Sequence, residues 1–171
     1  MIELERTYLA KSIPDDLKNC KSEEIIDTYI PREIDHPRLR LRKKGNRYTL
    51  TKKVALDKDP SKHEEHEIVL TDIEYNALRK IGGKEIRKVR YHYPYKNMIA
   101  EIDIFKGDLK GLVSVDFEFN SVEEKDSFRM PDFCLANVTN EKSIAGFTLC
   151  GKSYNEIKNT LDKYNYSKLS T

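Results

Sequence analysis

The stretch of residues 38–53 reads RLRLRKKGNRYTLTKK and gives one of the clearest indications of the fold. On each side of its centre, polar and apolar residues alternate with a period of two, as in a β-strand with one polar and one apolar face. The centre itself, the KGN of residues 44–46, is typical of a tight turn. The sequence therefore predicts a hairpin of two antiparallel strands, 38–43 and 47–54, whose polar faces carry mainly basic side chains.

The same alternation recurs along the chain and predicts an antiparallel α+β fold. The other expected strands cover residues 2–9, 27–30, 65–70, 86–93, 98–105 and 113–119. Helices are expected after Thr71, Ser121 and Ser153, because each is followed three residues later by Glu, the pattern of a capping box. Gly82 and Gly83 are expected to end the first of these helices.

Length and composition narrow the classes of function. With 171 residues and no repeat or linker, we expect a single domain over residues 1–171. A net charge of only +2 argues against the broad basic field of a duplex nucleic-acid binder. The three cysteines are far apart and in no CxxC pair, which predicts reduced thiols. No apolar run approaches a signal-peptide core or a membrane span, so we expect a cytoplasmic protein without membrane contact.

Charges on the polar faces are sorted by strand. A half-solvated sheet explains any one such strand, but a solvated face usually mixes in neutral polar residues, which are scarce here. The segregation therefore indicates a ligand that carries both charges. The acidic strands carry Glu3 and Glu5, Glu65 and Glu67, Glu101 and Asp103, and Asp116 and Glu118; the basic ones carry Arg38, Arg40 and Arg42, then Arg47 and Lys53, and finally Lys88 and Arg90.

Closure of eight such strands with the polar faces inward would leave a lumen for side chains and one small ligand. The outward apolar faces would then need helices as cover, and the apolar positions expected to supply it are Ile73, Leu78, Ile81, Ile157 and Leu161. Crowded carboxylates imply hard cations such as Mg²⁺ or Mn²⁺. Clustered Arg and Lys imply a phosphate-bearing anion.

The opening IELERTYLA, residues 2–10, is similar to the hallmark strand Glu-x-Glu-x-Lys of the CYTH domain superfamily, the triphosphate tunnel metalloenzymes. Downstream, RLRLRKKGNRYTLTKK, EEHEIVL, IRKVRYHY, AEIDIFKG, SVDFEF and NVTNEKSIAG follow in the order of that family. The resemblance spans nearly the whole chain. It implies an eight-stranded antiparallel β-barrel, a tunnel with a charged lumen and helices packed outside, that holds one or two Mg²⁺ or Mn²⁺ ions.

The resemblance also implies roles for individual residues. Asp103 is expected to support the metals, and Arg38 and Arg47 are expected at the tunnel mouth. Thr7 stands where the family has its motif lysine, so a phosphate-binding charge is missing there. The metal ligands would be Glu3, Glu5, Asp116 and Glu118. The catalytic pair, which serves a second metal or its water, would be Glu65 and Glu67. The phosphate-binding residues would be Arg40, Arg42, Lys53, Lys88 and Arg90.

The function implied is metal-dependent hydrolysis of a triphosphate, with inorganic triphosphate favoured over thiamine triphosphate or a nucleotide. Two alternatives stay open at this point. One is a class IV adenylate cyclase that makes cyclic AMP from ATP, and the other is a module that binds polyphosphate or a nucleotide without turnover. The expected partner is the small-molecule triphosphate, with no nucleic acid, and the chain is expected as a monomer or homodimer. The helix after Ser153 would close one tunnel end or cover apolar surface.

Overall fold

The hairpin expected around residues 44–46 forms as β3 (Leu39–Lys44) and β4 (Arg47–Ala55), which pair antiparallel on either side of Gly45. Gly45 has φ +56°, which a residue without a side chain adopts easily. The structure, a computed structural model, describes residues 2–35, 39–55 and 62–171, and only the backbone of residues 2, 3, 53, 55, 62 and 63.

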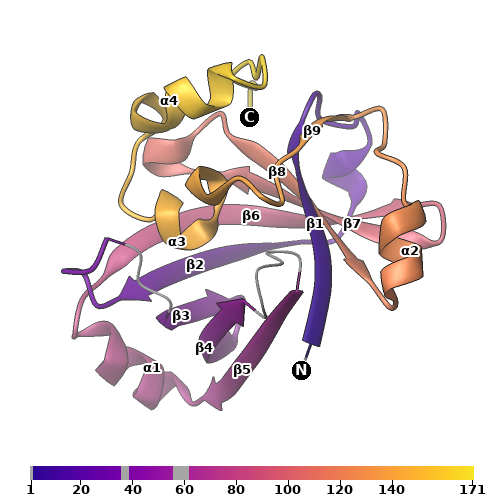
Figure 1. Ribbon diagram of the computed structural model, residues 1–171. Helices are drawn as coiled ribbons and strands as arrows, with labels where there is room; N and C mark the ends of the chain where they lie inside the picture. The colour runs from indigo at the N-terminus through magenta and orange to yellow at the C-terminus, as the bar shows by residue number, and fades with distance from the viewer. Residues whose placement is uncertain (1, 36–38, 56–61) are drawn as a thin grey trace.

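The remaining elements follow the expected alternation of strands and short helices (Figure 1). The strands are β1 (Ile2–Ala10), β2 (Ser22–Ile30), β5 (Lys62–Leu70), β6 (Lys84–Tyr95), β7 (Met98–Phe105), β8 (Val113–Phe119) and β9 (Cys134–Asn137). The α-helices are α1 (Asp72–Arg79), α2 (Val122–Ser127), α3 (Gly146–Leu149) and α4 (Tyr154–Asp162), and short 3-10 turns are η1 (Leu17–Asn19), η2 (Gly107–Leu109) and η3 (Lys142–Ile144).

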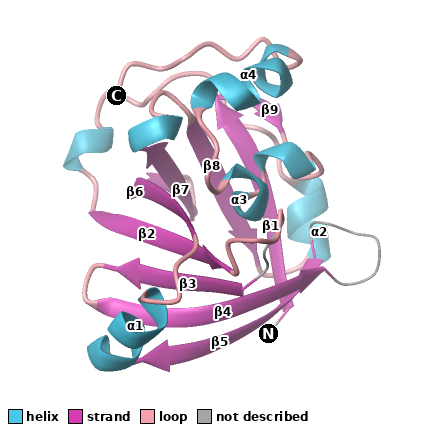
Figure 2. Ribbon diagram, turned by 90° about the vertical axis from the view of Figure 1, so that its left-hand side faces the viewer, coloured by secondary structure: helices cyan, strands magenta, loops and turns pink. Residues whose placement is uncertain are grey.

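Within the described residues, nine strands form one sheet in the order β5-β4-β3-β2-β6-β7-β8-β1-β9, and every pair is antiparallel. The α+β class is therefore confirmed. The expected count of eight strands was wrong, because β9 adds a ninth strand beside β1. In addition, β1 pairs with β5 over three residue pairs, from Ile2↔Glu64 to Leu4↔Lys62, so the two flanks of the sheet meet. Figure 2 shows the curvature that brings them together.

Capping fixes where three of the helices begin. Thr71 and Glu74 form the expected capping box at α1, and Ser153 and Glu156 form the one at α4. At α2, the Ser121 hydroxyl accepts from the Glu124 backbone amide. No helix in the described part of the chain is long and apolar enough to cross a membrane.

The apolar cover of the sheet differs from the expectation at α1. Ile73 and Ile81 are 75% and 66% exposed, so predicting them as the packing face was wrong. Tyr75 is the buried residue of α1, and Leu78 packs with it against β3 and β4. In a helix with 3.6 residues per turn, residues 75 and 78 lie on one side and residue 73 on the other. The packing face of α1 therefore contains Tyr75 and Leu78 and not Ile73.

The C-terminal helices cover one end of the sheet. Ile157 and Leu161 of α4 are buried, as expected, in a cluster with Leu149 of α3. The same cluster contains Tyr29 and Phe105, which stand directly opposite Arg40 and Lys88 in the strand register. Residues directly opposite in an antiparallel pair point to the same side. The helices α3 and α4 therefore pack on the side of the sheet that carries the charges, at one end of it (Figure 1).

Candidate functional site

One side of the curved sheet collects the charges, and the register shows that they share it. Arg90 stands opposite Asp103, Glu101 opposite Asp116, and Glu118 opposite Glu5. We call this side the charged face. Its described polar members include Glu5, Thr7, Asp27, Arg40, Arg42, Thr49, Thr51, Glu65, Glu67, Lys88, Arg90, Glu101, Asp103, Asp116 and Glu118.

On the β2–β3 side, Arg42 is held by a buried acid. Its Nε donates to Asp27 Oδ1 at 2.6 Å, and its Nη2 donates to Asp27 Oδ2 at 2.8 Å. Burial alone would raise the pKa of Asp27, but the Arg42 guanidinium outweighs it and holds that pKa well below its usual range. Asp27 thus stays ionised and fixes the Arg42 side chain in one orientation. Sequence reasoning missed Asp27, because it is a lone acid in an apolar run rather than part of an acid-x-acid pair.

In the middle of the sheet, Lys88 and Arg90 share the fully buried Asp103. Arg90 donates to both oxygens of this carboxylate, at 2.7 and 2.6 Å, and Lys88 donates to one of them. Arg90 also bonds to Glu101 and, at 3.2 Å, to Asp116. The two predicted phosphate-binding cations of β6 are therefore already paired with carboxylates. Asp103 contacts Lys88 and Arg90 directly.

Carboxylates crowd together where β1 meets β8. Glu5 and Glu118 are direct register partners, and Asp116 is one step along the same face. Burial, together with the charges of Asp103 and Glu5, raises the pKa of Asp116 to about 6, against the opposing effect of Arg90. Such crowding is relieved by a cation, and carboxylate oxygens are the ligands that Mg²⁺ and Mn²⁺ prefer. These carboxylates therefore have the ligand chemistry of a hard-cation site.

Thr7 lies within this acidic group. Its hydroxyl donates to Asp116 Oδ1 at 2.8 Å, and its backbone amide donates to Thr139 Oγ1 at 3.0 Å. The position of the motif lysine is thus occupied by a neutral donor that holds a carboxylate rather than by a cation.

The acids of β5 lie nearer to solvent. Glu65 is half-buried, whereas Glu67 is exposed as a residue and accepts from Arg47 Nη2 at 2.6 Å. Arg47 is itself exposed, in keeping with its expected place at the rim. Glu67 stands opposite Thr51 of β4 in the register, so both β5 acids remain on the charged face.

Three of the predicted site positions fall outside the residues or side chains that the structure describes: Glu3 and Lys53, known here by their backbone, and Arg38. Within the described residues, no three His, Cys, Asp or Glu side chains form a group able to hold a metal ion. The ligand set of Glu3, Glu5, Asp116 and Glu118 therefore stays a prediction. The three cysteines are free thiols, as expected.

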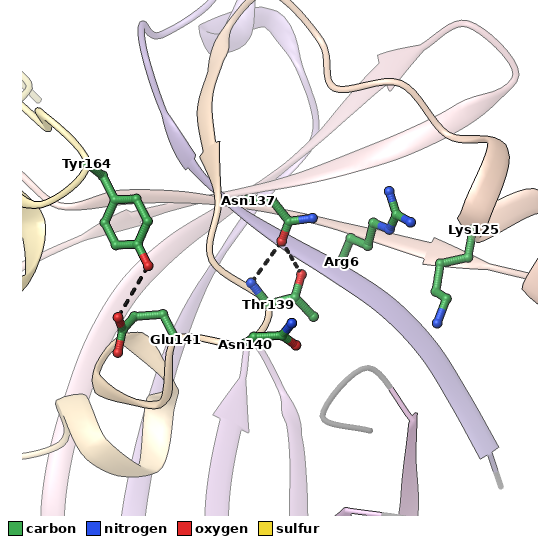
Figure 3. A pocket seen from close by; sticks show the side chains of 7 residues that line it. All are labelled: Arg6, Lys125, Asn137, Thr139, Asn140, Glu141 and Tyr164. Carbon is green, nitrogen blue, oxygen red and sulfur yellow. Dashed lines mark hydrogen bonds between the residues drawn. The ribbon is translucent and has the colours of Figure 1, made fainter. Parts of the chain in front are cut away.

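A pocket of about 390 Å³ lies beside β1 and β9, apart from the charged face. Figure 3 shows Asn137 and Thr139 hydrogen-bonded at its centre, with Arg6 and Lys125 on one side and Glu141 and Tyr164 on the other. Its acid, Glu141, is engaged by the Ser143 amide and the Tyr164 hydroxyl. The pocket contributes no pair of carboxylates, so the charged face is the stronger candidate for the active site.

Comparison with known proteins gives consistent matches. An inorganic triphosphatase from Nitrosomonas europaea is 28% identical over 144 residues, which cover 83% of this chain and 92% of that protein. The crystal structure of an inorganic triphosphatase superimposes with a TM-score of 0.65 at 26% identity, covering 88% of this chain and 95% of the other.

A candidate adenylate cyclase from Bacillus halodurans shares the fold, with a TM-score of 0.54 at 15% identity over 99% of this chain and 92% of the other. No protein-family model matches the sequence. Together these matches confirm the resemblance to the triphosphate tunnel family that the sequence motifs carry.

Proposed function

We propose that this protein hydrolyses a triphosphate with the help of divalent cations, and that inorganic triphosphate is its substrate. The observation that carries the proposal is the charged face, on which Arg and Lys side chains lie within hydrogen-bonding distance of a larger group of carboxylates. The relative from Nitrosomonas europaea, an inorganic triphosphatase aligned over most of both chains, supports the activity and the substrate.

We further infer that the pairing of β1 with β5 closes strands β1–β8 into a tunnel around the charged face. Support for closure comes from the three residue pairs between these strands and from the burial of Asp103, Lys88 and Arg90, which a solvated sheet face would leave open. The apolar cluster under α3 and α4 would then plug one end. Substrate would enter from the other end, where Glu67 and Arg47 are exposed.

A divalent cation would be held by the full predicted set of Glu3 and Glu5 on β1 and Asp116 and Glu118 on β8, of which the Glu3 side chain lies outside the described residues. Bound there, the cation would neutralise phosphate oxygens and lower the pKa of a coordinated water. The charge balance of the face requires such help, because its described carboxylates outnumber its described cations. Without added positive charge the site would repel a polyanion.

The basic side chains would bind and orient the phosphate chain. Arg40 and Arg42 project from β3 and Lys88 and Arg90 from β6, so an anion between them is contacted from both sides. Asp27 and Asp103 hold three of these cations in place before substrate arrives, which lowers the entropy cost of binding. Lys53 is proposed to add a contact from β4.

Glu65 and Glu67 are proposed to orient the attacking water. They lie on β5, across the tunnel from the β6 cations, and a carboxylate there can accept a proton from water as it attacks the terminal phosphorus. The products are orthophosphate and diphosphate. Thr7 adds no charge to the phosphate site, and it holds Asp116, a proposed metal ligand, by its hydroxyl.

The proposal is tested by phosphate release from inorganic triphosphate, thiamine triphosphate and ATP with Mg²⁺ or Mn²⁺, with cyclic AMP assayed in the ATP reactions. We expect release from inorganic triphosphate and its loss by at least about 100-fold in Glu5→Gln. Glu33→Gln, at an exposed acid outside the sheet, is the matched control and should retain activity. Cyclic AMP as the main product, or triphosphate binding with no release, would refute the proposal.

A further inference from the structure

Three donors on one wall of the charged face have no hydrogen-bond partner within the described part of the chain: Thr49 Oγ1, Thr51 Oγ1 and Arg40 Nε. Thr49 and Thr51 are only 3% and 1% exposed, so bulk water does not reach them. Buried polar groups in proteins are nearly always paired. Three unpaired donors on neighbouring strands therefore need a physical explanation.

The three groups lie side by side. Thr51 stands directly opposite Arg40, and Thr49 stands directly opposite Arg42, across the β3–β4 pair. Their side chains thus share the charged face, and the two threonines are two residues apart, or roughly 6.6 Å, along β4. The hydroxyls of Thr49 and Thr51 form a short row of donors next to the two arginines, and we call these two residues the β4 row.

Packing does not explain why threonine is present at these positions. Valine has nearly the same shape and an equal preference for strands, and it would leave no unpaired hydroxyl. An unsatisfied buried hydroxyl is a net cost to the folded state. The hydroxyls of the β4 row are therefore expected to bond to a ligand that the protein alone does not provide.

The neighbours of the row define the chemistry of that ligand. Arg40 and Arg42 make this wall electropositive, which favours a negatively charged acceptor for the unpaired donors. Arg42 is held in place on this wall by Asp27. The spacing along β4 suits an acceptor with oxygens at several points along its length. A linear chain of phosphates has this form.

We propose that Thr49 and Thr51 are substrate-binding residues whose hydroxyls donate to oxygens of the phosphate chain, next to Arg40 Nε. This inference rests on the proposed function and adds a neutral row of donors to its charged residues. Neutral donors bind phosphate oxygens without adding charge, so they select for length and geometry of the chain.

The experiment compares Thr49→Val, Thr51→Val and the double variant with Thr28→Val as control. Thr28 also has a buried hydroxyl without a partner among the described residues, but it alternates with Asp27 along β2 and so lies on the opposite side of the sheet. Two quantities are measured: the KM for inorganic triphosphate, and the Kd, by calorimetry with Mg²⁺, of diimidotriphosphate, whose bridging nitrogens resist hydrolysis.

We expect each valine variant in the β4 row to raise KM and Kd by about 10-fold, the loss of one hydrogen bond to a charged group. The double variant should raise them further, and Thr28→Val should leave both unchanged. The thermal midpoint of the unliganded β4 variants should not fall. Thr51→Ser keeps the hydroxyl and should retain most of the affinity, which separates hydrogen bonding from any packing defect.

Unchanged KM and Kd in the double variant, or an equal effect of Thr28→Val, would overturn the inference. Failure of the proposed function has a different signature. If the wild-type protein releases no phosphate yet binds diimidotriphosphate with affinity that depends on Thr49 and Thr51, the hydrolytic proposal fails and the binding role of the β4 row stands.

Discussion

Replacing Asp27 by Asn tests how the proposed phosphate-binding cations are held in place. Asp27 is 2% exposed, and Arg42 donates to both of its carboxylate oxygens. Removal of one partner of a buried ion pair costs about 3–5 kcal/mol, because a buried charge is left uncompensated. Asn keeps one acceptor, and the Arg42 side chain is 15% exposed, so we expect the lower end, about 3 kcal/mol. For a chain of this length, that lowers Tm by roughly 6–12 °C.

The ligand should partly reverse this loss. In Asp27→Asn the guanidinium of Arg42 faces the site without a counter-charge, so diimidotriphosphate with Mg²⁺ should raise Tm more in the variant than in the wild type. The pH dependence has a definite sign. The folded-state pKa of Asp27 is depressed, so its contribution is present above the unfolded pKa of about 3.9 and is lost as pH falls through the folded value. The difference between the two proteins should therefore shrink below about pH 4.

The assay is thermal unfolding followed by circular dichroism at several pH values, with and without the phosphate analogue. Asp162→Asn is the control, because the Lys158–Asp162 pair is exposed and its loss should leave Tm nearly unchanged. A Tm of Asp27→Asn equal to that of the wild type, or a ligand-induced rise no larger than in the wild type, would show that Asp27 does not hold Arg42 in place.

Two further variants probe the site and its support. Thr7→Lys brings a cation to Asp116 and to the proposed phosphate site, so the KM for inorganic triphosphate should fall by about 10-fold in steady-state assays. An unchanged or higher KM would mean that the position does not reach the substrate. Tyr166→Phe removes a hydroxyl that donates to the Gly111 carbonyl at 2.8 Å and accepts from the Val113 amide at 2.9 Å. This variant should destabilise the fold by about 1–3 kcal/mol in denaturant titrations and leave KM unchanged. A raised KM would contradict a purely structural role for Tyr166.

Strand alternation made most of the sheet predictable. The polar and apolar faces of residues 38–54 follow directly from a period of two, and the capping boxes at Thr71 and Ser153 mark true helix starts. The ninth strand was not predicted because CLAN, at residues 134–137, is too short to show alternation. The packing side of α1 was also missed, since the sequence reading placed Ile73 on the apolar stripe instead of Tyr75.

For the candidate site, residue types were predictable but their partners were not. Which strands become neighbours depends on the whole topology, so the sequence could not indicate that Asp27 of β2 would hold Arg42, or that Asp103 would be shared by Lys88 and Arg90. The threonines of the β4 row were visible on a polar face between Arg47 and Lys53, yet only burial shows that their hydroxyls lack partners among the described residues. Pairing and burial arise from tertiary packing, which no local pattern encodes.

The most direct test of the central claim is phosphate release from inorganic triphosphate by the purified protein, measured with Mg²⁺ or Mn²⁺ and again with excess chelator, alongside Glu5→Gln. We expect release that requires the divalent ion, stops in the chelator without unfolding the protein, and falls by at least about 100-fold in the variant. Equal release in the chelator, or a fully active Glu5→Gln, would contradict a metal-dependent reaction on the charged face.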